Sequence, residues 1–148
     1  TMWAMATLDV KGLGPDSEFQ AAAATTPDLE PQQVSNALWA LARSSSSTNP
    51  LTAVVLVRSA NHHASRRAFS PQQIANTLWA VAVLSLGATN AELAPMSEAL
   101  QAGIALDRAG FNTAEISMSL WALASLRYED TSGLPNDMAG IAAARVSE

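Results

Sequence analysis

The chain has no cysteine, few charged residues and no long apolar run, and the first and last of these absences each exclude a class of structure. Without cysteine there can be neither a disulfide framework nor a thiolate metal site. Charged residues make up only 14% of the 148 residues, and the net charge is −5. No run of about 18 apolar residues occurs, and the longest candidate, Leu78 to Leu86, is interrupted by Ser85. Nothing in the sequence therefore predicts a membrane-spanning helix.

Motifs for catalysis and for cofactor or metal binding are missing as well. The carboxylates are scattered, and there is neither a nucleophile motif nor a glycine-rich phosphate loop. His62 and His63 are the only conceivable metal pair. Adjacent residues on a helix diverge by about 100°, and no third ligand is evident. The sequence predicts a protein that is not an enzyme and that needs no cofactor or metal.

One phrase recurs along the chain at near-constant spacing. It reads PQQVSNALWALA from Pro31, PQQIANTLWAVA from Pro71 and, more loosely, TAEISMSLWALA from Thr113, and a truncated copy, WAMATL, begins at Trp3. All four tryptophans belong to the phrase, at positions 3, 39, 79 and 121. A period of about 40 residues is typical of stacked repeat proteins, in which each repeat contacts mainly its neighbours.

Each repeat reads as two helices joined by a turn. In the phrase, apolar residues recur at i, i+4, i+7 and i+8 from Val34, Ile74 and Ile116, which predicts an amphipathic first helix. The phrases lie near residues 1–9, 31–44, 71–86 and 113–127. We expect the second helices near residues 16–24, 51–64, 91–108 and 135–146. Pro95 moves the expected start of the third of these towards Ala94.

These patterns predict an all-α fold, an α-solenoid of about 3.5 repeats of ~40 residues, each a pair of antiparallel helices. We expect residues 1–148 to form a single array that is a segment of a longer solenoid. Small residues of the phrase would let helix backbones approach closely, among them Ala40, Ala80 and Ala122. The tryptophans could stack bases, but we expect them in the core, because aromatic residues at helical spacing are more often buried.

The phrase resembles the repeats of the octotricopeptide repeat family. The resemblance is carried by NALWALA from Asn36, NTLWAVA from Asn76 and SLWALA from Ser119, with Met118 in place of the asparagine. The PPPEW-like motif of some members is not present. The resemblance implies a solenoid that binds RNA in a mitochondrion or chloroplast. It further implies a role in RNA stability, processing or translation, or as a ribosomal subunit that stabilises ribosomal RNA beside other ribosomal or assembly proteins.

If the first helices line the concave surface, their polar side chains are candidate RNA contacts. On a helical wheel, the side opposite Val34 carries Gln33, Asn36, Ala40 and Arg43. The equivalent positions are Gln73, Asn76, Ala80 and Val83 in the next phrase, and Glu115, Met118, Ala122 and Ser125 in the last. Amide side chains can hydrogen-bond the base edges of single-stranded RNA. The alternative is that these amides are solvated first-turn residues or cap neighbouring helices.

Basic residues cluster only in VRSANHHASRR, which contains Arg58, Arg66 and Arg67. This cluster is a candidate phosphate-binding strip, and its alternative is a solvated helix end. Because the chain is acidic overall, any contact with RNA would be local or supplied by repeats outside these residues. Two functions follow as hypotheses: an organellar RNA-binding protein, or a protein-binding scaffold subunit of a large organellar complex without direct RNA contact. The RNA target, the organelle and the partners stay open, and catalysis could lie only in a domain outside these residues.

Overall fold

The computed structural model describes residues 29–43, 50–84, 88–107, 110–129, 138–141 and 143, and these contain helices and no strands. The helices are α3 (Pro31–Arg43), α4 (Pro50–Ser65), α5 (Pro71–Leu84), α6 (Asn90–Leu106) and α7 (Thr113–Ser125). Residues 138–141 are also helical. The predicted all-α fold is confirmed. The phrase around Trp3 and the helix expected over residues 16–24 lie outside the described residues.

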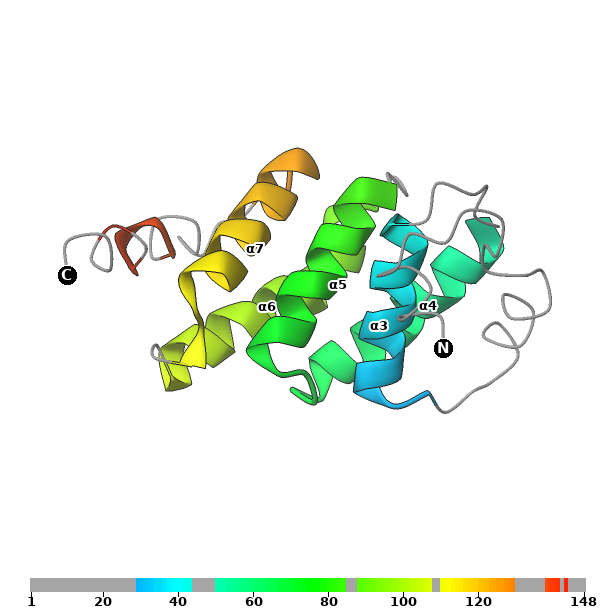
Figure 1. Ribbon diagram of the computed structural model, residues 1–148, viewed down its shortest axis with the longest axis horizontal. Coiled ribbons are helices and arrows are strands. Elements are labelled where there is room, and N and C mark those ends of the chain that lie inside the picture. The colour runs from blue at the N-terminus through cyan, green and yellow to red at the C-terminus, as the bar shows by residue number, and fades with distance from the viewer. Residues whose placement is uncertain are drawn as a thin grey trace.

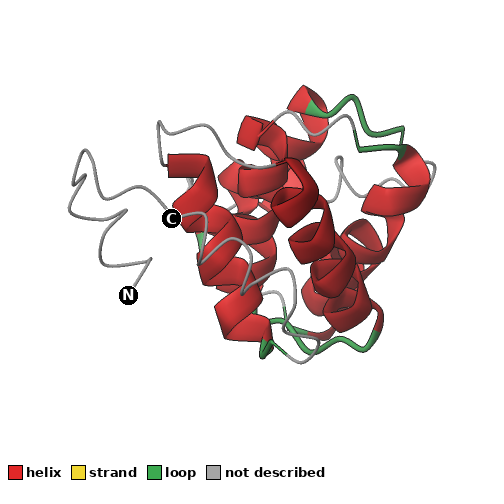
Figure 2. Cartoon of the chain, turned by 90° about the vertical axis from the view of Figure 1, so that its right-hand side faces the viewer, coloured by secondary structure: helices red, strands yellow, loops and turns green. Residues whose placement is uncertain are grey.

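The helices form two layers (Figure 1). In the first layer α3, α5 and α7 lie side by side, and each runs from the bottom to the top of the view. In the second layer α4 and α6 contact each other, while α4 packs on α3 and α6 packs on α5. Seen along the stack in Figure 2, the connecting loops lie at the helix ends. Helix pairs that contact mainly their neighbours are the arrangement of an α-solenoid.

The helices of the first layer begin with similar capping hydrogen bonds. Ser70 N–H donates to Gln73 Oε1 at 2.9 Å, and Gln73 N–H donates to Ser70 Oγ at 3.3 Å. Asn112 and Glu115 form the same reciprocal pair at the start of α7. At α3, the Glu30 N–H donates to Gln33 Oε1 at 2.9 Å. The reciprocal pairs at α5 and α7 are capping boxes, and the Gln33 bond at α3 is half of one; these bonds satisfy backbone N–H groups that the first helical turn leaves without partners.

An apolar residue precedes each of these caps, namely Leu29, Phe69 or Phe111. Phe69 and Phe111 are buried, and Leu29 packs against the same core. The apolar residue four positions after each cap, Ile74 in α5 for example, is also in this core. A hydrophobic pair on either side of a cap fixes the angle at which the chain enters the helix. Each repeat thus carries its own start signal.

The second-layer helix α6 begins earlier than Pro95 suggested. Thr89 caps it in a box with Glu92, and the helix runs from Asn90 with Pro95 inside it. The expected shift of the start towards Ala94 is therefore wrong. The capping box at Thr89 determines the boundary, and the proline is accommodated within the helix.

A hydrogen bond between repeats shows which faces of the first-layer helices meet. Ser35 Oγ of α3 donates to the Gln73 carbonyl oxygen of α5 at 3.3 Å. The side of α3 that carries Ser35 therefore packs on the side of α5 that carries Gln73. The phrase alanines lie buried in this layer, with exposed fractions of 2% for Ala40 and 0% for Ala80 and Ala122. The helical-wheel prediction that these alanines lie on the outer face is wrong. Their burial fits the other prediction, that small residues let the helices approach closely.

Candidate nucleic-acid interface

The outward face of the first layer carries one ridge of side chains on each helix. The ridges consist of Gln32, Asn36, Trp39 and Arg43 in α3; Gln72, Asn76, Trp79 and Val83 in α5; and Ala114, Met118, Trp121 and Ser125 in α7. All twelve are exposed or half-buried. Steps of four, three and four residues keep a ridge on one side of a helix. We call the three ridges together the ridge surface.

Tryptophan occupies the same place in each ridge. Trp39 and Trp79 are half-buried, and Trp121 is 51% exposed. The expectation that the tryptophans lie in the core is wrong for Trp121 and only partly met by the other two, while Trp3 lies outside the described residues. The position lies at the rim of the contact with the next first-layer helix. In the part of the chain that the structure describes, no such helix follows α7, so Trp121 is the most open.

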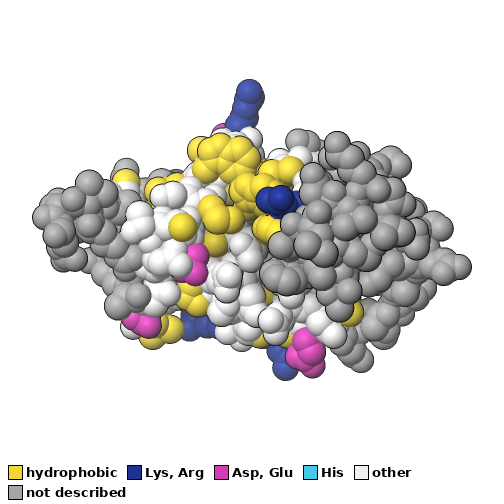
Figure 3. Space-filling view, viewed as in Figure 1, with side chains coloured by type: hydrophobic (Ala, Val, Ile, Leu, Met, Phe, Trp, Pro, Cys, Tyr) yellow, Lys and Arg dark blue, Asp and Glu magenta, His cyan; other side chains and the backbone are white. Residues whose placement is uncertain are grey.

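The ridge surface combines amide, aromatic and aliphatic side chains with one arginine. Asn36 and Asn76 lie half-buried, one turn before the tryptophans. The Arg43 guanidinium lies over the Trp39 ring, 5.1 Å from its centroid, in a cation–π contact. Viewed in Figure 3, the face bears a gathering of hydrophobic side chains across its upper part, with Lys or Arg side chains beside them. Asn36, Asn76 and Arg43 are thus the predicted site residues that the structure brings onto one face.

Gln33 and Gln73 serve as helix caps. Their Oε1 atoms accept the N–H groups of Glu30 and Ser70 at 2.9 Å. Each glutamine thus caps its own helix, and not a neighbouring one as the alternative had it. Contact of Gln33 or Gln73 with RNA stays a prediction, and it would have to coexist with the cap.

The three arginines of the basic cluster belong to a different part of the molecule. Arg58, His62 and Arg66 follow one another at four-residue spacing along the exposed side of α4 and the turn after it. Arg66 Nη1 lies 3.4 Å from His62 Nε2, and Arg67 is exposed in the same turn. Because α4 is in the second layer, the structure does not bring these arginines together with Asn36 and Asn76.

The neighbouring histidines of α4 diverge as expected. His62 is exposed, whereas His63 turns inward and places Nε2 2.8 Å from the Leu29 carbonyl oxygen. No group of three or more His, Asp or Glu side chains that could hold a metal ion is found among the described residues. Within the same residues, no helix is long and apolar enough to cross a membrane.

Sequence reasoning missed Gln32 and Gln72 as members of the exposed ridges, and for the tryptophans it preferred the core to base stacking. The signal was present in the phrase, because an alanine that allows close helix approach must face a neighbouring helix rather than solvent. Placing Ala40 in that contact rotates the outward face from Gln33 to Gln32, and from Ala40 to Trp39. Comparison with known protein families, with curated proteins and with solved structures gives no match for this chain.

Proposed function

We propose that this chain is part of a non-enzymatic, organellar RNA-binding protein of the helical-repeat type, and that its ridge surface binds single-stranded RNA. The observation that carries the proposal is the tryptophan at the same half-open position of three successive parallel helices. Every base has a π-face, so a row of aromatic rings can stack successive bases regardless of sequence. The resemblance to octotricopeptide repeats supports a mitochondrial or plastid RNA, ribosomal or messenger, as the target.

The neighbouring side chains supply the remaining chemistry. Asn36 and Asn76 lie one turn from the rings, where an amide can hydrogen-bond the edge of a stacked base. Arg43, held over Trp39, can stack or contact a phosphate group. Because Arg43 is the only cation of the three ridges, stacking would contribute more to the affinity than phosphate contacts. The salt dependence should then be shallow.

Titration of the purified chain with short single-stranded RNAs tests this proposal. Tryptophan fluorescence reports stacking directly, and Trp121 is the best position to change because its side chain is already half exposed. Trp121→Ala should weaken binding about tenfold, since stacking contributes roughly 1–3 kcal/mol per base. Trp121→Phe should recover part of the loss because it restores a planar ring.

Val54→Ala is the matched control. Val54 is 38% exposed on α4, away from the ridge surface, and its loss should leave RNA affinity unchanged. Equal affinity of the Trp121→Ala and unaltered chains would contradict the ridge surface as the binding site. Failure of the chain to bind any single-stranded RNA at low salt would reject the RNA proposal as a whole.

A protein-binding scaffold subunit of a large organellar complex is the second candidate. It is favoured by exposed apolar side chains outside the ridge tryptophans, with Leu106 77% and Val83 38% exposed. The net charge of −5 also suits a protein partner better than a polyanion. The two functions are compatible, because a subunit of a ribonucleoprotein particle touches both RNA and protein.

A further inference from the structure

In the first layer, α3 and α5 each present one side to the first-layer helix that follows, α5 after α3 and α7 after α5 (Figure 1). The Ser35 bond to the Gln73 carbonyl oxygen marks this side of α3. Positions three, four and seven residues after Ser35 lie on the same side. The tryptophan at this side and the alanine three residues after it are half-buried in both helices. The small residue and the leucine are fully buried, namely Ser35, Leu38, Ala75 and Leu78.

The same side of α7 is open. Its residues are the counterparts Ser117, Leu120, Trp121 and Ala124. Ser117 and Ala124 are exposed, Trp121 is 51% exposed, and Leu120 is only half-buried. At all four positions α7 is thus more accessible than α3 and α5, and in the described part of the chain no first-layer helix covers it. We call these four residues the open face.

Two contacts within the chain show what such a face accepts. α5 covers α3 with the side that carries Gln73, and Thr77 and Ala80 on this side are fully buried. α7 covers α5 with the corresponding residues, Ser119 and Ala122, which are also fully buried. Both covering helices therefore present two small side chains three residues apart, which lets the backbones approach closely. A helix with this pattern would fit the open face in the same way.

A second copy of the chain does not have such a helix side available. The small-residue sides of α5 and α7 are already occupied by the preceding helices. In α3 the equivalent residues, Ala37 and Ala40, are only 7% and 2% exposed, so this side is covered as well. The open face carries no charged side chain and therefore does not attract a nucleic-acid backbone. The occupant that fits is a helix of another polypeptide.

We propose that the open face binds an α-helix of a protein partner, one that presents two small residues three positions apart and lies parallel to α7. Ser117 donates to a first-turn carbonyl oxygen of that helix, as its counterpart in α3 does to α5. Docking covers Leu120 and Ala124 and leaves Trp121 half-buried, like the tryptophans of α3 and α5. A half-buried ring can still stack a base, so this site does not depend on RNA binding at the ridge surface.

Fluorescence anisotropy of a labelled peptide, titrated with the full chain, tests the proposal. The peptide copies residues 69–84, which are α5 and its cap. A cross-link between the outward-facing positions of Gln72 and Asn76 holds it helical. We expect this peptide to bind the unaltered chain. A second peptide with Thr77→Leu and Ala80→Leu keeps the same apolar stripe but should bind about tenfold more weakly, because larger side chains prevent the close approach.

Two arginine variants of the chain locate the binding site. Ala124→Arg places a charge on the open face, at an exposed position where it does not threaten the fold. It should weaken peptide binding about tenfold, because the partner helix would bury an unpaired charge. Ser125→Arg is the matched control, since it adds the same charge one residue later on the ridge surface. It should leave peptide binding unchanged.

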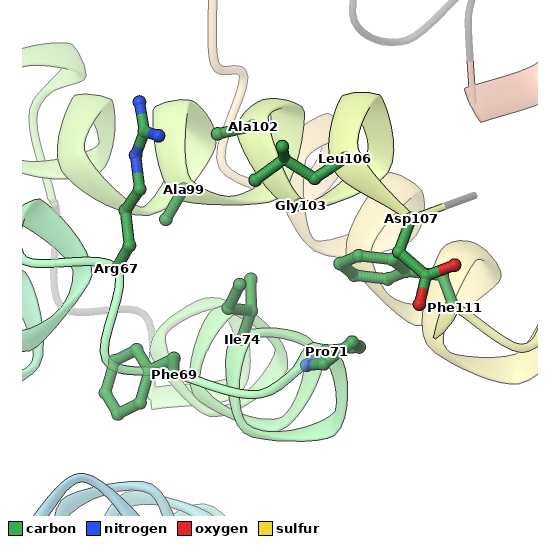
Figure 4. A pocket seen from close by; sticks show the side chains of 10 residues that line it. All are labelled: Arg67, Phe69, Pro71, Ile74, Ala99, Ala102, Gly103, Leu106, Asp107 and Phe111. Carbon is green, nitrogen blue, oxygen red and sulfur yellow. The ribbon is translucent and has the colours of Figure 1, made fainter. Parts of the chain in front are cut away.

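Leu106→Ala controls for non-specific apolar contact. Leu106 is 77% exposed, more than any other large hydrophobic residue in the described part of the chain. It lies on α6 and lines a pocket of about 250 Å³ between α5 and α6, not on the open face (Figure 4). The loss of this side chain should therefore leave peptide binding unchanged.

The proposal is overturned if the first peptide does not bind the unaltered chain, or if the two peptides bind equally well. Equal binding to Ala124→Arg and Ser125→Arg would also overturn it. Sedimentation of the chain alone examines a different occupant. A dimer that Ala124→Arg dissociates would assign the open face to a second copy of the chain and not to a partner.

Discussion

Arginine occupies a backbone position that usually belongs to glycine. Arg67 and Arg127 have φ values of 54° and 52°. After α4, the Arg67 N–H donates to the Ala64 carbonyl oxygen and the Ala68 N–H to that of His63. This pair of bonds is a Schellman motif with Arg67 in the left-handed conformation. A side chain there costs about 1 kcal/mol or more, because Cβ crowds the following carbonyl group.

Arg67→Gly should therefore raise the free energy of unfolding, by about 0.5–1 kcal/mol once the greater freedom of glycine in the unfolded chain is included. Urea unfolding of the full chain measures the change. Arg66→Gly is the control, since it removes the same charge one residue earlier, where φ is not positive. A loss of stability in Arg67→Gly as large as in the control would refute the argument from backbone strain.

At the scale of a helix, the start of α6 carries a pH-sensitive cap. Glu92 Oε2 accepts from the Thr89 backbone N–H at 2.8 Å and from Thr89 Oγ1 at 2.9 Å. The backbone bond is the largest cause, and the side-chain bond the next, of a pKa for Glu92 below the ordinary value of 4.5. A depressed pKa in the folded state means that this stabilisation is present above about pH 4.5 and is lost as pH falls through the folded pKa.

Glu92→Gln should accordingly lower stability at neutral pH, and the difference from the unaltered chain should shrink as the pH is taken well below 4.5. Thermal unfolding over a series of pH values measures it. Thr89→Ser retains the hydroxyl and the backbone donor, so it should keep the pH dependence. A Glu92→Gln deficit that is constant from neutral to acidic pH would show that the cap does not act through the charge of Glu92.

The contact between first-layer helices is set by small side chains. Ala80 is fully buried on α5, and the Ser35–Gln73 bond orients that side of α5 towards α3. Ala80→Leu should destabilise the chain by about 1–3 kcal/mol, because a larger side chain forces the two helices apart. Chemical denaturation gives the value. Ala124→Leu, at an exposed position of α7, should change stability by no more than about 0.5 kcal/mol.

Helix existence and pairing could be predicted from the sequence, but the rotation of each first helix could not. The recurrence of Val34, Leu38 and Leu41 marks the side that faces the second layer, and the structure buries all three. The helical-wheel analysis took only this one apolar stripe into account. First-layer helices also pack on one another through Ala40 and its equivalents, which are too small to register as a second stripe. The candidate site was displaced by one residue for this reason.

At the scale of the whole molecule, the period predicted the two-layer repeat, because each amphipathic helix must cover the next. It could not show that the basic cluster and the amide positions lie on different layers. That separation depends on which face of α4 is exposed, and the second helices are too dissimilar in sequence to reveal it.

The separation of the two layers allows one experiment to decide which of them meets RNA. Arg43→Gln changes the ridge surface and Arg58→Gln changes the exposed side of α4, and each removes one positive charge. If RNA lies on the ridge surface, Arg43→Gln should lower the slope of log affinity against log salt by about 0.7 and Arg58→Gln should not. The reverse result would move the interface to α4.

The cap and apolar pair at the start of each first helix also bear on the order in which the chain acquires structure. Contacts join mainly the corresponding helices of neighbouring repeats, such as α3 with α5 and α4 with α6, and each unit has its own start signal, so folding need not wait for the C-terminal residues to be synthesised. During translation, α3, α4 and α5 can pack while α7 is still inside the ribosomal tunnel. The row of tryptophans would then form one ring at a time, and each ring would become partly covered when the next first-layer helix packs beside it.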